Sequence, residues 1–137
     1  MALTASVERP HLTDQELREY PVEASAKIYK GAGLGKSASG HAQPLVAGNV
    51  FLGLAYEEAD NTGGADGAKK VRAYTVGDFE VPLSSAAQSN QGDKVYMSDD
   101  GTFTFTSTSN SFVGHCMGLG DAANTIVLRL MVNNPAV

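Results

Sequence analysis

Apolar and polar side chains alternate over short stretches of this chain, and turn-forming residues separate the stretches. The alternation is clear in residues 78–83, and after the turn Ser98–Gly101 two phenylalanines alternate with threonines in residues 102–106. A period of two is typical of a β-strand that buries one face. The Asp-Gly pair in the turn favours a hairpin between Val95–Met97 and Phe103–Phe105. The pattern therefore predicts short antiparallel strands.

Two further segments are apolar on both alternating faces, Val50–Tyr56 and Thr125–Val132, the second interrupted by Arg129. Such a pattern predicts strands that are covered on two sides. One face of each strand is expected to line the core and the other to pack against a neighbouring subunit. The residues predicted for this subunit interface are Val50, Leu52, Leu54, Ile126, Leu128 and Leu130.

Strands are also predicted at Ala26–Tyr29, Lys70–Val76 and Ser111–Cys116, with Gly-rich turns between them. Several short strands at regular spacing favour a small barrel or sandwich over alternating βαβ units. The predicted fold is all-β: a small β-barrel or β-sandwich of short antiparallel strands with an extended N-terminal arm. Residues 23–137 are assigned to the β domain and residues 1–22 to the arm.

The arm contains no glycine, and Thr13–Glu16 matches the capping-box pattern of a helix start. A short helix is predicted over Asp14–Glu19, ended by Pro21 because proline disfavours a helical residue before it. A helix of this length is marginal alone in water, so its apolar side chains need a surface to lie on. The residues predicted to make that contact are Leu12, Leu17, Tyr20 and Pro21.

The amino-acid composition argues against several classes of binding partner for this chain. The formal net charge of -5 leaves no excess of cations to neutralise a phosphate backbone, so nucleic acid is not an expected partner. The most apolar stretch, Ile126–Val132, is far shorter than the roughly 20 residues of a membrane-spanning helix. The charged first thirty residues do not resemble a secretory signal, and the single Cys116 cannot form an internal disulfide.

Catalytic motifs are incomplete. Gly31–Ser37 ends like a P-loop, but Lys30 stands where the first glycine belongs, so a flexible loop is predicted there instead. Cys116 could be paired with His41 or His115 as nucleophile and base. His115 is its neighbour in a predicted strand, where adjacent side chains face opposite sides. A small buried thiol is the favoured interpretation, and no catalytic residue is predicted.

Metal and cofactor motifs are also lacking. The three histidines and the cysteine lie in unrelated segments without ligand spacing, so no metal site and no cofactor are predicted. The acidic loop Glu57–Asp66 lacks the oxygen ligands of an EF-hand at Thr62 and Gly64. A solvated hairpin tip is expected there, with weak calcium binding left open.

Four pieces of the sequence, taken in order, carry a family resemblance: Phe51–Ala55, Gly77–Leu83, Gln91–Tyr96, and Phe112–His115 leading to Ile126–Leu130. Together they resemble the capsid decoration, or cement, proteins of tailed bacteriophages. The resemblance implies a β-barrel-like domain that assembles, often as trimers, on the outer surface of an icosahedral head and bridges neighbouring capsid subunits. It implies no enzyme.

The hypothesis is a virion structural protein, made in the host cytoplasm, that binds the outer capsid surface. It would stabilise the shell as a homotrimer that bridges major capsid subunits, using the arm for the capsid contact. The alternative is a small glycan- or receptor-binding β module on the virion surface, with Gly31–His41 and Asn61–Gly67 as recognition loops. A thiol hydrolase built on Cys116 is the third hypothesis.

Overall fold

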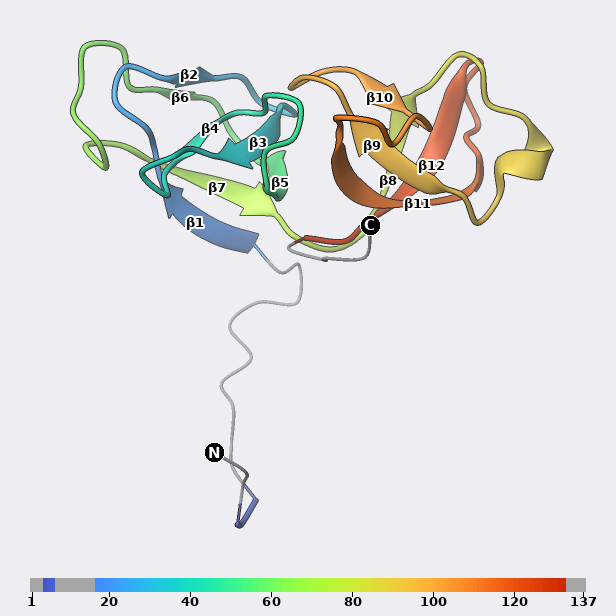
Figure 1. The fold of residues 1–137 in the computed structure, drawn as a ribbon, viewed down its shortest axis with the longest axis horizontal. Helices are drawn as coiled ribbons and strands as arrows, with labels where there is room; N and C mark the ends of the chain where they lie inside the picture. Colours follow the sequence, from blue (N-terminus) through green and yellow to red (C-terminus); the bar gives the residue numbers. More distant parts are fainter. Residues whose placement is uncertain (1–3, 7–16, 133–137) are drawn as a thin grey trace.

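The computed structural model describes residues 4–6 and 17–132. They form two five-stranded sheets and one two-stranded sheet, and every pairing between the named strands is antiparallel (Figure 1). Within these residues the only helical element is one 3₁₀ turn, η1 (Gln88–Asn90). The all-β prediction is confirmed. The sheets are open, which is consistent with a sandwich and not with a closed barrel.

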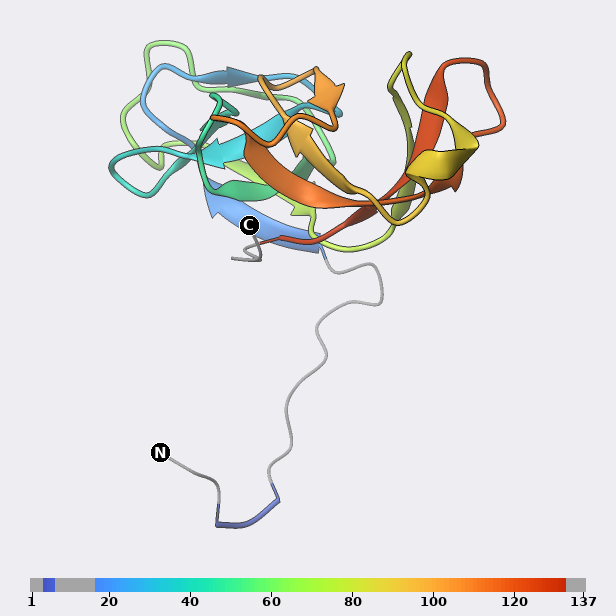
Figure 2. The same cartoon turned by 45° about the vertical axis from the view of Figure 1, so that its right-hand side comes forward.

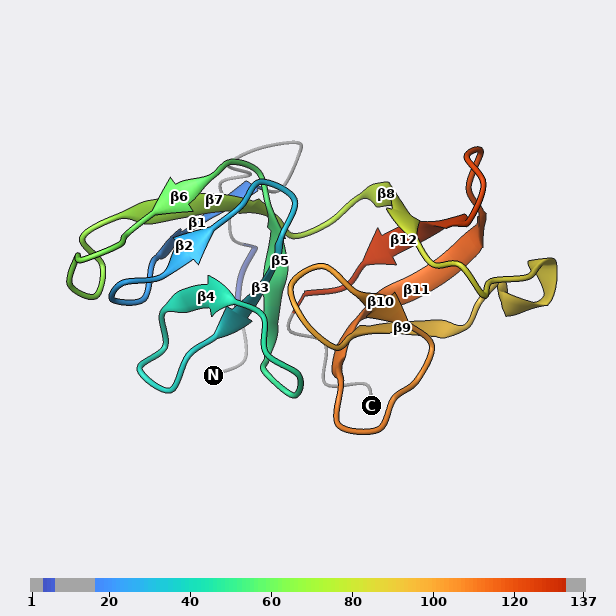
Figure 3. The ribbon, with the colours of Figure 1, turned by 90° about the horizontal axis from the view of Figure 1, so that it is seen from above.

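The N-terminal sheet is built from the first half of the chain. In spatial order its strands are β1 (Leu17–Pro21), β7 (Lys70–Tyr74), β5 (Phe51–Ala55), β3 (Gly33–Lys36) and β4 (Ala42–Pro44). A two-stranded sheet, β2 (Lys27–Ile28) with β6 (Ala59–Asp60), belongs to the same half. Figure 3 shows this half beside the other one, with the chain crossing over between β7 and β8.

The C-terminal sheet uses the remaining strands. Their spatial order is β10 (Phe103–Thr104), β9 (Lys94–Met97), β11 (Ser111–Leu119), β12 (Thr125–Leu130) and β8 (Asp78–Pro82). The predicted hairpin is confirmed, because Phe103 of β10 pairs with Met97 of β9. Strand β11 extends beyond the predicted segment and curves through the middle of this half (Figure 2).

Buried side chains form two clusters, and β5 contributes to both. The shared core joins Phe51 and Leu54 to apolar residues of the C-terminal sheet. The N-terminal core contains Leu52 and Ala55. Its other members, among them Ile28, also belong to the first half of the chain. The two-faced apolar pattern of β5 is therefore satisfied inside one chain, without a second subunit.

A β-bulge places β5 between the two cores. Gly35 of β3 pairs with Phe51, whereas the preceding Leu34 pairs with Gly53, so Leu52 is an extra residue. The bulge changes which side the following residues face, which brings Phe51 and Leu54 to the same core despite their odd spacing. Gly53 has φ 136°, and a Cβ there would collide with the Tyr74 carbonyl oxygen. Only glycine fits this position.

A second bulge lies in β11. Phe112 pairs with Tyr96 and Gly114 pairs with Val95, which leaves Val113 as the extra residue. Val113 is fully buried in the shared core. A Cβ on Gly114 would collide with the carbonyl oxygen of Arg129 in the neighbouring strand β12, so glycine is required here to let the two backbones approach.

The predicted helix over Asp14–Glu19 is wrong in its described part. Residues Leu17–Pro21 form β1, which pairs with β7 along its whole length, from Leu17 opposite Tyr74 to Pro21 opposite Lys70. A capping box stabilises one helix end only, whereas this ladder supplies backbone partners over five residues. The sheet thus includes Leu17–Pro21. Asp14–Glu16 lie outside the described residues, and the division of the chain at residues 22 and 23 stays a prediction.

The flexible loop predicted at Gly31–Ser37 is also wrong, because Gly33–Lys36 forms β3 between β5 and β4. Its glycines allow close packing: a Cβ on Gly33 would collide with the side chain of Met97, and one on Gly35 with that of Asn49. A buried strand here also removes much of the loop surface that the glycan-binding alternative requires.

Replacing Gly114 with alanine is expected to lower the free energy of unfolding by more than about 2 kcal/mol, because the methyl group meets backbone that cannot move independently. The control is Gly40→Ala, which has φ 88° and open space around its Cα, so its cost is limited to about 1–2 kcal/mol of backbone strain. Urea unfolding followed by circular dichroism measures both. Equal losses would contradict the role given to the β11–β12 approach.

Candidate functional site

Strand β1 is an edge strand, with a neighbour on one side only among the described strands. Leu17 and Tyr20 are half-buried, and Tyr20 packs against the N-terminal core. Burial raises the pKa of the Tyr20 phenol, and a nearby Arg18 opposes this shift only in part. Pro21 is exposed at the end of the strand, where the missing N–H costs no ladder bond with another strand. Of the predicted arm contacts, Leu12 lies outside the described residues.

A groove of about 490 Å³ runs from this edge to the end of β12. Its walls combine the polar and apolar side chains of β1 with the segments that follow β7 and β12. The lining residues are Arg18, Tyr20, Thr75, Val76, Leu130, Met131 and Val132. The edge of β1 and the C-terminal sheet therefore border the same hollow.

Most residues predicted for a subunit interface are buried by the chain itself. Leu52 lies in the N-terminal core, and the shared core contains Leu54, Ile126, Leu128 and Leu130. Val50 differs, because 45% of its surface is exposed. The interface role of these residues stays a prediction. Val50 is the member of the set whose side chain is exposed enough to contact a neighbouring subunit.

Val50 ends a turn between β4 and β5 that we call the valine turn, residues Val46–Val50. Val46, at the other end, is 58% exposed. The Oδ1 atom of Asn49 accepts hydrogen bonds from the Val46 N–H at 2.9 Å and the Gln43 amide at 3.2 Å. The Ser111 hydroxyl donates to the Asn49 carbonyl at 2.6 Å. Two apolar side chains thus stand exposed on a turn that is tied to both sheets.

The thiol of Cys116 is fully buried in the shared core, so the predicted small buried thiol is confirmed. Its Sγ atom lies 3.6 Å from the Gly118 carbonyl oxygen. The neighbouring His115 ring packs on Phe112, and its Nδ1 atom lies 3.0 Å from the Met131 sulfur. His41 instead contacts Ser39. The contacts of these side chains show no thiol–imidazole pair.

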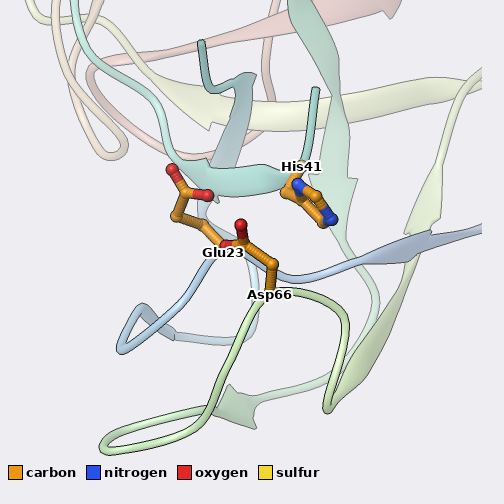
Figure 4. Close-up of side chains that lie close together, drawn as sticks. All are labelled: Glu23, His41 and Asp66. Atoms are coloured by element: carbon orange, nitrogen blue, oxygen red, sulfur yellow. The ribbon is translucent and has the colours of Figure 1, made fainter. Parts of the chain in front are cut away.

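Three ionisable side chains that the sequence did not connect meet at one place, which we call the carboxylate–histidine cluster: Glu23, His41 and Asp66 (Figure 4). Glu23 follows β1, His41 directly precedes β4, and Asp66 lies in the loop between β6 and β7. One potential ligand atom from each residue lies within 4.8 Å of the other two. Glu23 and His41 are half-buried and Asp66 is exposed.

Hydrogen bonds hold each member of the cluster. The Ser39 hydroxyl donates to Glu23 Oε1 at 2.8 Å and lies 2.9 Å from His41 Nδ1. The Ala24 N–H donates to Asp66 Oδ1 at 2.8 Å. This N–H lowers the pKa of Asp66 most, followed by a hydrogen bond with Glu23 and the charge of His41. The carboxyl groups of Glu23 and Asp66 therefore lie close together, with one oxygen of each within 4.8 Å of the other.

Asn61 ties together the loops that carry the two carboxylates. Its side-chain amide donates to the Glu23 carbonyl at 2.9 Å and the Ala65 carbonyl at 3.0 Å. Only 2% of Asn61 is exposed, so the solvated hairpin tip expected for this loop is wrong at this residue. The positions of Glu23 and Asp66 are set by a buried anchor and not by solvent-exposed chain.

Two bidentate ion pairs lie on the sheet surfaces. Arg72 binds Glu57 at 2.8 and 3.0 Å, and Arg129 of β12 binds Asp78 of β8 at 2.7 and 2.9 Å. These hydrogen bonds lower the pKa values of Glu57 and Asp78. Arg129, which interrupts an apolar strand in the sequence, therefore has a cross-strand partner.

The fold and its surfaces define a small antiparallel β protein with two cores, whose buried thiol has no base among its contacts. Residues 20–131 match the family model of the phage cement proteins, so the chain belongs to the phage cement protein family. This confirms the family resemblance and a capsid-associated structural role. No curated protein and no solved structure gives a significant match. No helix in the described part of the chain is long and apolar enough to cross a membrane.

Stability is expected to fall as the pH drops below about 4.5. Glu57 and Asp78 have pKa values below the ordinary 4.5 and 3.8, so their ion pairs stabilise the folded state above those values and are lost as pH falls through the lowered ones. Urea midpoints measured from pH 7 to pH 3 test this. Arg129→Gln should unfold slightly more easily than the wild type at pH 7, and the difference should vanish at low pH. A difference that persists there would contradict the assignment.

Proposed function

We propose that this protein binds the outer surface of a phage capsid and stabilises the shell by bridging neighbouring major capsid subunits. The observation that carries this proposal is the family match over residues 20–131, which spans nearly all of the described fold. The structure adds surfaces suited to contacts between proteins: the edge of β1, which has one neighbour among the described strands, and the exposed valine turn.

Net charge supports the outer surface as the binding side. The interior of a filled head is packed with DNA, and a protein with a formal charge of -5 is repelled by that polyanion. The two surface ion pairs also leave Arg72 and Arg129 engaged with carboxylates and not available as a cationic patch. A location outside the shell avoids this repulsion.

The stabilising mechanism is linkage. A ligand that binds only the assembled shell lowers its free energy by RT ln(1 + [L]/Kd), so the bound shell resists disassembly more strongly than the bare one. An oligomer that engages several capsid subunits at once gains from effective concentration. Contacts between capsid subunits would then oppose the internal pressure of packaged DNA.

The capsid contact is assigned to the chain that leads into β1, together with the edge of that strand that lies away from β7. Leu17, Tyr20 and Pro21 lie at this edge, and Leu12 precedes it. An edge strand offers unpaired backbone N–H and C=O groups, to which an extended segment of another protein can add. The groove beside Arg18 and Tyr20 gives side chains of such a segment a place to pack.

Deleting residues 1–16 is expected to abolish binding to heads while leaving a folded protein, because the deletion stops short of β1. A longer deletion through Pro21 would remove a sheet strand and would not separate binding from folding. The measurement is co-sedimentation with heads that lack the protein, with circular dichroism as the folding check. Leu12→Asp should weaken binding, and Leu119→Asp, at an exposed position outside the arm, should not. Normal occupancy by the truncated chain would refute this contact.

A homotrimer that packs through the valine turn is the expected assembly. Replacing both Val46 and Val50 with aspartate should dissociate it, because a charge at an apolar contact has to be desolvated without a partner. Analytical ultracentrifugation of wild type and variant gives the masses. Val76→Asp, at an equally exposed valine outside the turn, is the matched control. A wild-type monomer, or a trimer that survives the double change, would overturn the assignment.

A further inference from the structure

We propose that Glu23, His41 and Asp66 form a binding site for one first-row divalent cation, with Zn²⁺ as the best match. The site offers an imidazole nitrogen and two carboxylates from three segments that the fold brings together. The number of protein ligands and the donor atoms, imidazole nitrogen and carboxylate oxygen, are those found in open zinc sites, which leave further positions to water. The proposal concerns the isolated chain and does not depend on capsid binding.

The geometry requires only small side-chain movements. The candidate ligand atoms lie within 4.8 Å of one another, whereas ligands bound to zinc at about 2.0–2.2 Å from the metal are roughly 3.3 Å apart. Asp66 is exposed, and Glu23 and His41 are half-buried, so rotation of the side chains can close this difference. The backbone of both carboxylate-bearing loops is held by buried Asn61.

Proton counting assigns a tautomer to His41 that suits a metal ligand. The hydroxyl of Ser39 has a single proton, which it donates to Glu23. The contact between Ser39 and His41 must then be donated by the Nδ1–H of the ring. A neutral His41 consequently carries its lone pair on Nε2. A second partner that fixes the tautomer in this way is the usual arrangement around metal-binding histidines.

The proximity of the two carboxyl groups provides the electrostatic reason for a cation. One oxygen atom of Glu23 and one of Asp66 lie within 4.8 Å of each other, and two ionised carboxylates at this separation repel each other. A divalent cation removes this conflict, because it attracts both ionised groups at neutral pH. The chain's formal charge of -5 adds a favourable field for cation binding.

The imidazole decides which cations fit. Oxygen-only sites suit Ca²⁺ and Mg²⁺, whereas a nitrogen ligand favours Zn²⁺ and its neighbours in the first transition row. Binding would connect Glu23, two residues after β1, with His41, directly before β4, and with the loop between β6 and β7. The ion would therefore fasten three loops around the N-terminal core.

The test is thermal unfolding of the full chain after EDTA treatment and dialysis, with increasing ZnCl₂. The melting temperature should rise in a saturable way, by roughly 5 °C or more, since a ligand of the folded state stabilises it. Isothermal titration should give one ion per chain, and MgCl₂ and CaCl₂ should have little effect. His41→Gln and Asp66→Asn should each weaken Zn²⁺ binding at least tenfold. Asp66→Asn keeps an acceptor for the Ala24 N–H, so this variant is expected to fold.

Asp121→Asn, at an exposed carboxylate outside the cluster, is the control and should bind as the wild type does. Three results would overturn the proposal: no saturable stabilisation, binding that both cluster variants retain, or equal responses to Zn²⁺ and Ca²⁺. If His41→Gln fails to fold, the Zn²⁺ affinity of Asp66→Asn and the number of Zn²⁺ ions bound per wild-type chain still test the proposal. Loss of zinc binding leaves head binding untouched, so the two proposals can fail independently.

Discussion

The packing of β5 on both faces is the constraint on which the rest of this structure depends. Phe51 and Leu54 face the shared core, and Leu52 and Ala55 face the N-terminal core. This division requires the bulge at Leu52 and the glycine at position 53, where a side chain would collide with the carbonyl oxygen of Tyr74. One strand thereby joins two small clusters, neither of which is large for a domain. Among the described strands, β5 is the one whose buried side chains belong to both clusters.

Strand positions could be predicted from the sequence because a period of two is a local signal. The β9–β10 hairpin and the strand β8 follow directly from the alternation around Phe103 and Phe79. What covers each apolar face of a strand could not be predicted in the same way. The pattern of β5 is apolar on both faces, and a second core and a second subunit produce the same pattern in a sequence. The structure decides between them by placing Leu52 against the chain's own residues.

The incorrect predictions of a helix over Asp14–Glu19 and of a flexible loop at Gly31–Ser37 share a physical cause. The capping box before Leu17 and the glycines around Leu34 are local preferences, and in both places pairing with a distant strand is stronger. The carboxylate–histidine cluster could not be predicted from the sequence for a related reason. Its members come from three loops, and contacts between residues far apart in the chain, such as those of Asn61, bring two of these loops together. No spacing rule for metal ligands applies to residues that the tertiary fold assembles.

A cement protein has to resist deformation and present surfaces, and this distribution of features suits that task. The cores and the glycine contacts lie in the centre of the molecule, whereas the edge of β1 and the valine turn lie at its surface. Asn49 links the surface to the interior. Its side chain shapes the valine turn, and its carbonyl oxygen accepts a hydrogen bond from Ser111 of β11. The valine turn is therefore connected to the C-terminal sheet by a hydrogen bond. In such an arrangement the surface features are connected to the packed interior, since Tyr20 of β1 packs against the N-terminal core and the valine turn is hydrogen-bonded to β11.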